Sequence, residues 1–258
     1  MEVSLPRKTG IMIKNKPFQI DLRKLIQNSA SLRRDLQKIY DRIPATRCLR
    51  QGQCCSLLPE MTFLEALQAL SVLESRPLSD RINVTQKMVR YFLGNAMEIS
   101  SCPFLQGRDC LIYQDRFFGC RAYGLWSGVF YQNLADQNRQ GKRVLQQQWE
   151  KLGISLPAEV LSFKIPYCSQ VETDPPLEIS DEMLSAASDR IENLSGEMNP
   201  WDQEFRGKYF SDLSFFLTGL QFGPQEAVRL KYFITKDIIQ KADRSLMDQV
   251  LSRVKDLF

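Results

Sequence analysis

Over most of this chain, apolar residues recur every three or four positions, which is the spacing of one buried face on an α-helix. This spacing holds between Asp21 and Ile43, where Asp21 is the predicted N-cap and Pro44 follows the end. Thr62 is predicted to cap the next helix, and Glu65 completes a capping box with it. Further helices are expected over residues 80–97, 134–152, 156–163, 180–194, 201–222, 224–242 and 246–257. The pattern therefore predicts a mainly α fold with a bundle-like helical body.

Little β structure is expected outside this body. Residues 11–20 are predicted to form a small hairpin, and residues 111–113 a short buried strand beside a cysteine. Paired prolines and acidic residues make 171–180 the best candidate for a linker. We therefore expect a cysteine-containing domain over 1–170, with a helical C-terminal region over 171–258 packed on it.

The cysteines are concentrated in two irregular stretches between predicted helices. Six of the seven fall there: Cys48, Cys54 and Cys55 in the first stretch, and Cys102, Cys110 and Cys120 in the second. An antiparallel pairing of the two intervening helices would bring the stretches together. Gly52 and Gly107 allow the backbone to turn tightly beside two of these cysteines. Cys168 stands apart, either as a further ligand or as an ordinary buried thiol.

This clustering favours a thiolate metal site. The sequence contains no histidine, which excludes mixed cysteine–histidine zinc sites, histidine-based catalytic triads and facial triads. Clustered cysteines in a chain without an apparent export signal favour metal or redox chemistry over disulfides. Cys54 and Cys55 are adjacent, and neighbouring side chains of an extended segment point to opposite sides. Only one of them is therefore expected to bind a given metal, unless the backbone bends sharply or two metals are held.

The spacing of the cysteines leaves zinc and an iron–sulfur cluster both open. The paired Cys-x-x-Cys knuckles of zinc ribbons are absent from the sequence, and the other intervals within the two stretches, from Cys48 to Cys54, Cys102 to Cys110 and Cys110 to Cys120, are wide. Wide intervals suit a cluster at least as well as a single ion. Arg116 and Arg121 lie close to Cys120, where they could offset the negative charge of thiolates and donate hydrogen bonds to sulfur.

The composition of the chain indicates the class of protein that would carry such a site. The hydrophobic content of 43% and the net charge of +4 are those of an ordinary globular protein, and no long basic run indicates nucleic-acid binding. The N-terminal residues lack the apolar core of a signal peptide, and no stretch approaches transmembrane length. The expectation is a cytoplasmic protein without a membrane partner.

The ordered pattern of these residues resembles the YkgJ-type cysteine-cluster family, a zinc- or iron-chelating domain. It runs Cys…Cys-Cys…Cys-Pro-Phe-Leu…Cys-Leu-Ile-Tyr…Arg…Cys-Arg-x-Tyr and spans Cys48 to Tyr123, under a third of the chain. Phe117 stands where the family usually has proline, and the first cysteine interval is longer than is common. A relative with a similar cysteine pattern is the flagellin lysine methylase, whose activity is thought to need an iron–sulfur cluster and S-adenosylmethionine.

Three functions follow as hypotheses. The resemblance implies a metal- or cluster-binding protein, slightly favours the cluster over zinc, and makes S-adenosylmethionine a candidate cofactor for methyl transfer onto a protein side chain. In such an enzyme Tyr113, Arg116, Arg121 and Tyr123 are the candidate catalytic residues. The second hypothesis is a structural zinc protein whose C-terminal helices bind a protein partner. The third is metal storage or delivery by the surplus thiols.

Overall fold

The computed structural model describes residues 21–47, 52–169, 171–174 and 177–258. Its mainly helical architecture confirms the predicted fold class. The helices are α1 Leu22–Asn28, α2 Ala30–Tyr40, α3 Phe63–Glu74, α4 Leu78–Gly94, α5 Phe118–Arg121, α6 Gly128–Lys151, α7 Ala158–Ser162, α8 Asp181–Gly196, α9 Trp201–Tyr209, α10 Leu213–Phe222, α11 Pro224–Lys241 and α12 Ser245–Leu251. The short 3₁₀ helices are η1 Gln53–Ser56 and η2 Tyr113–Asp115. Each described helix is too short or too polar to cross a membrane.

Two small antiparallel sheets accompany the helices. Strands β2 Leu105–Gln106 and β3 Asp109–Cys110 form a tight hairpin, whose turn uses Gly107 with a φ of 60°. Strand β1 Ala45–Arg47 pairs with β4 Glu172–Asp174. The β2–β3 hairpin includes Cys110, but the strand predicted over 111–113 is wrong because η2 begins at Tyr113. The hairpin predicted over 11–20 lies outside the described residues.

Helix α10 forms the centre of the body because all its residues are buried. Helices α4 and α11 lie against it, and the main hydrophobic cluster contains residues from α1 to the segment after α12. The segment 171–180, which was the candidate linker, contains β4 and pairs through it with β1. It is therefore not a simple linker. The core contains residues from both sides of position 170, and the division into two domains stays a prediction.

Two predicted helices are interrupted. The stretch after Asp21 divides into α1 and α2 at Ser29. The buried hydroxyl of Ser29 donates to the main-chain carbonyl of Ile26, and such a local hydrogen bond competes with the regular helical pattern. The stretch 201–222 divides into α9 and α10, because Phe210 and Ser211 adopt the left-handed conformation. Neither break has a glycine or proline to mark it in the sequence.

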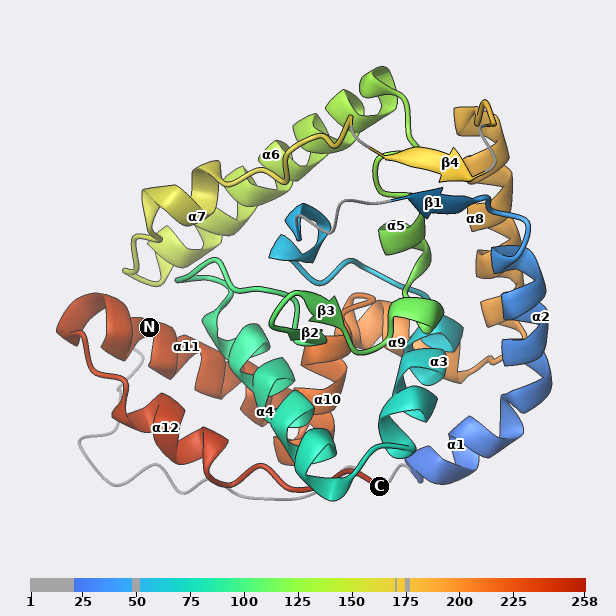
Figure 1. Ribbon diagram of the computed structural model, residues 1–258. Helices are drawn as coiled ribbons and strands as arrows, with labels where there is room; N and C mark the ends of the chain where they lie inside the picture. Colours follow the sequence, from blue (N-terminus) through green and yellow to red (C-terminus); the bar gives the residue numbers. More distant parts are fainter. Residues whose placement is uncertain (1–20, 48–51, 170, 175–176) are drawn as a thin grey trace.

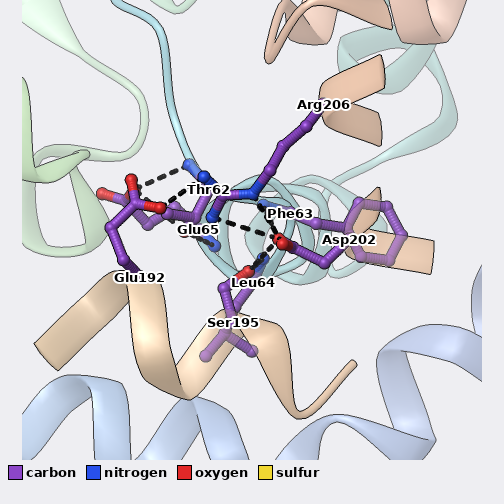
Figure 2. A network of polar contacts seen from close by, with 8 residues as sticks. All are labelled: Thr62, Phe63, Leu64, Glu65, Glu192, Ser195, Asp202 and Arg206. Carbon is purple, nitrogen blue, oxygen red and sulfur yellow. Dashed lines mark hydrogen bonds and ion pairs between the residues drawn. The ribbon is translucent and has the colours of Figure 1, made fainter. Parts of the chain in front are cut away.

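The start of α3 is the best-secured helix end near the cysteines. The predicted capping box forms, with Thr62 Oγ1 accepting from the Glu65 amide and Glu65 accepting from the Thr62 amide. Figure 2 shows how side chains from α8 and α9 complete this end, where Ser195 Oγ accepts from the Leu64 amide at 3.1 Å. The Ser195 hydroxyl in turn donates to Asp202 at 2.5 Å. These bonds satisfy amides that a helix start leaves without intrahelical partners, so α3 is held firmly.

A close approach at Gly219 in α10 gives a first prediction. A Cβ at this position would lie 2.8 Å from Cε1 of the buried Tyr209, whereas a Cβ at Gly207 in α9 would meet nothing within 4 Å. Gly219→Ala is expected to lower the free energy of unfolding by about 1–3 kcal/mol through overpacking. Gly207→Ala should instead raise it by about 0.5–1 kcal/mol, because alanine favours the helix. Urea denaturation of both variants measures the difference, and equal effects would contradict the packing.

Candidate metal centre

Five cysteines line one cavity of about 310 Å³ in the middle of the molecule. They are Cys54, Cys55, Cys102, Cys110 and Cys120. In Figure 1 the labelled elements around this region are β2, β3 and α5, with α6 and α7 on one side and α2 and α8 on the other. The two cysteine stretches, which are far apart in sequence, therefore converge on one place as expected.

The first cysteine stretch bends sharply. Gly52 adopts a φ of 73° before η1, and the short helix then carries Cys54 and Cys55. Their sulfur atoms lie 3.8 Å apart and both residues line the cavity. Because the backbone bends here, the adjacent thiols of Cys54 and Cys55 do not point to opposite sides, as they would in an extended segment.

The second stretch is tied to the first through the main chain. The Cys102 amide donates to the Cys55 carbonyl at 2.7 Å, which joins the segment after α4 to η1. The β2–β3 hairpin then places Cys110 opposite Leu105. Lys87 of α4 donates to the Leu105 carbonyl at 3.1 Å and fixes the hairpin on the helical body. Main-chain hydrogen bonds thus position Cys102 and Cys110 on the wall of the cavity.

Helix α5 presents Cys120, and the buried Glu65 of α3 holds this helix in place. Glu65 Oε1 accepts from the Phe118 amide, which opens α5, at 2.6 Å, and from the Tyr40 hydroxyl at 2.8 Å. The other carboxylate oxygen closes the capping box with Thr62. One carboxylate therefore links α2, α3 and the helix that carries Cys120.

Burial governs the protonation of these thiols. Desolvation raises the pKa of Cys102 to about 12, and it also raises the pKa of Cys110 and of Cys120. The hydrogen bond between the thiols of Cys54 and Cys55 lowers the pKa of Cys54 to about 7 and raises the pKa of Cys55. A cation in the cavity would offset the cost of forming buried thiolates.

The candidate arginines have different positions. Arg116 lines the cavity, donates to the Tyr113 carbonyl at 3.1 Å and lies over the Tyr113 ring. Arg121 does not line the cavity. Its guanidinium donates to the carbonyls of Arg116 and Gln114 and lies over the ring of Tyr40. Arg116 can therefore act on the cavity directly, whereas Arg121 holds the loop that carries Arg116.

The other candidate residues do not all lie on the wall of the cysteine cavity. Tyr113 and Tyr123 line the cavity, and the Tyr123 hydroxyl donates to the Pro166 carbonyl at 2.5 Å. Cys168 does not line the cysteine cavity but a neighbouring, larger one. Cys48 lies outside the described residues, so its role as a ligand stays a prediction.

Two features were not predicted from the sequence. Val171, from the segment read as a linker, lies on the wall of the cysteine cavity, and the chain there passes close to Gly124. A Cβ at Gly124 would lie 2.6 Å from Val171 Cγ2, and the φ of 81° also favours glycine. The second feature is the role of Glu65 at α5. The capping box was visible in the sequence, but its long-range partners left no local signal.

The donor set fits a soft metal, because five thiols face one space and thiolates are the preferred ligands of zinc and iron–sulfur clusters. Within the described ranges, no three or more cysteine or carboxylate side chains already stand where a single metal ion could be held. The residues therefore match the chemistry of a metal centre, while the side-chain arrangement is not that of a closed single-ion site. Comparison of the chain with protein-family models, curated proteins and solved structures gives no match.

Proposed function

We propose that this protein binds a metal centre through the thiolates of Cys54, Cys55, Cys102, Cys110 and Cys120. The observation that carries the proposal is their convergence on one cavity from η1, the β2–β3 region and α5. A single buried free cysteine is common in a protein core. Five cysteines that were each buried only for packing would not be expected to line the same cavity. Cys48 is the candidate for a sixth ligand, because it precedes η1 in the same stretch.

An iron–sulfur cluster is the centre that the cavity favours. Two thiolates on one tetrahedral zinc stand about 3.8 Å apart, since each Zn–S bond is about 2.3 Å long. The four thiolates of a [4Fe–4S] cluster each bond to a different iron atom and therefore stand further from one another. The cavity of about 310 Å³ exceeds the needs of one ion, and the five thiols are not gathered around a single point. Both observations favour a polynuclear centre.

A four-thiolate zinc site is the second candidate. The 3.8 Å separation between the sulfur atoms of Cys54 and Cys55 favours it, since this is the spacing of two ligands on one zinc ion. Such an ion would hold η1 against the segment around Cys102 and would act structurally. Zinc binding requires small movements that bring two further thiols to this pair.

Purification without air distinguishes the two centres. A cluster predicts a brown protein with broad visible absorption that contains iron and acid-labile sulfide. A structural site predicts a colourless protein with about one zinc per chain, as for a closed four-thiolate site. Protein that carries neither metal after air-free purification, and takes up neither on reconstitution with iron and sulfide or with zinc, would overturn the proposal.

The YkgJ-type resemblance stays a prediction, and so does methyl transfer from S-adenosylmethionine. Three of the candidate catalytic residues, Tyr113, Arg116 and Tyr123, lie on the wall of the cysteine cavity, where they could contact a reacting group. Incubation of reconstituted protein with methyl-labelled S-adenosylmethionine and a lysine-rich protein tests for transfer. A protein partner of the C-terminal helices likewise stays a prediction.

A further inference from the structure

A second cavity of about 580 Å³ lies beside the cysteine cavity, and Tyr123 lies on the wall of both. Helix α6 and the segment around α7 form one side of it, while α4 and α11 contribute to the other. Its lining is largely apolar and aromatic, and includes Trp126 and Tyr131. Leu134 and Leu145 of α6 also line the cavity, and their side chains are 45% and 38% exposed. This volume is in the range of pockets that hold small organic ligands.

Lys231 of α11 brings a positive charge to this apolar cavity. Its ammonium donates to Asn95 Oδ1 at 2.6 Å and lies 4.4 Å from the centre of the Phe92 ring. In the part of the chain that the structure describes, no carboxylate lies within ion-pair distance of it. Desolvation lowers the pKa of Lys231 to about 8, against the opposing effect of the negative charge on Asp212, so the group is mostly protonated at neutral pH.

The carboxylate on the cavity wall does not balance this charge. Glu98 is the acidic residue among those described as lining the cavity, and it already pairs with Arg244 at 3.1 Å and Arg90 at 3.7 Å. Lys142 and Lys164 add further positive charge to the wall. Lys142 directs its ammonium to two main-chain carbonyls near α7. Arg139 on the same wall pairs with Asp136, and Lys164 is exposed. Lys231 is therefore the cation best placed to meet a ligand inside the cavity.

From these contacts we propose that the second cavity binds a small organic anion with an apolar body, and that Lys231 pairs with its anionic group. The apolar lining would take the body of the ligand, and a carboxylate, sulfonate or phosphate would supply the ion pair at contact distance that Asp212 does not form with Lys231. The proposal does not depend on a metal in the cysteine cavity, so the two can fail separately.

A matched pair of fluorescent probes tests this proposal. 1-Anilinonaphthalene-8-sulfonate carries a sulfonate on an aromatic body, and N-phenyl-1-naphthylamine is the same body without the charge. We expect the full chain to bind one sulfonate probe and to prefer it to the neutral probe by about tenfold, the size of a charge-assisted hydrogen bond. Equal affinity for the two probes would overturn the proposal without any variant.

Two variants locate the binding. Lys231→Met should reduce the affinity for the sulfonate probe about tenfold and leave that for the neutral probe unchanged. Lys236→Met is the control, because Lys236 lies on the same helix but not on the cavity wall. Ala135→Trp places a large side chain on the α6 wall of the cavity and should lower the affinity for both probes. Undiminished sulfonate binding by Lys231→Met or by Ala135→Trp would contradict the proposal, and circular dichroism verifies that each variant is folded.

Discussion

The Cys110→Ser variant is expected to lose most of its bound metal while keeping its helical fold. Cys110 lines the cysteine cavity but is held by main-chain pairing with Leu105, which a serine retains. A serine hydroxyl is a poor ligand for a soft metal, so the centre loses one of its ligands. Metal analysis after air-free purification gives the loss, and circular dichroism gives the fold.

Cys168→Ser is the matched control for this prediction. Cys168 is also a partly buried free thiol, but it lies on the wall of the second cavity. This variant should keep its full metal content. Equal metal content in Cys110→Ser, Cys168→Ser and the unchanged protein would show that Cys110 is not a ligand.

The second large effect is expected from Glu65→Ala. This change removes the acceptor for the buried amide of Thr62, the buried hydroxyl of Tyr40 and the partly buried amide of Phe118. Buried donors without partners cost about 1–3 kcal/mol each, so the free energy of unfolding should fall by about 3 kcal/mol or more. Because the Phe118 amide opens the helix that carries Cys120, metal content should fall as well.

Two further variants grade this effect in urea denaturation. Glu65→Gln keeps one oxygen as an acceptor and should lose less stability than Glu65→Ala. Glu60→Ala, at an exposed position in the same segment, should change the free energy of unfolding by no more than about 0.5 kcal/mol. If Glu65→Ala behaved like Glu60→Ala, the carboxylate would not be the link between α3 and α5.

The sequence predicted those parts of the fold that depend on local patterns. Asp21 and Thr62 cap helices as expected, because an N-cap needs only a side-chain oxygen and the following turn. The break at Ser29 and the left-handed residues Phe210 and Ser211 were missed, since tertiary packing rather than a local glycine sets them. The pairing of β1 with β4 was missed because no short-range signal specifies a partner so distant in sequence.

The candidate site could be predicted from the sequence only where it depends on local patterns. The convergence of the two cysteine stretches followed from the helices between them, but the relative orientation of Cys54 and Cys55 depended on the bend at Gly52. Arg121 was expected near the thiols because of sequence proximity, yet it holds the loop of Arg116 instead. The second cavity had no motif, since its walls come from segments spread over most of the chain.

Alkylation of the cysteines in air-free protein, before and after metal removal, tests the central claim most directly. Mass spectrometry reports each thiol that iodoacetamide modifies. We predict that metal protects Cys54, Cys55, Cys102, Cys110 and Cys120, that chelation exposes them together, and that Cys168 reacts equally in both states. The same experiment assigns Cys48. A modification pattern that metal removal leaves unchanged would contradict a shared centre.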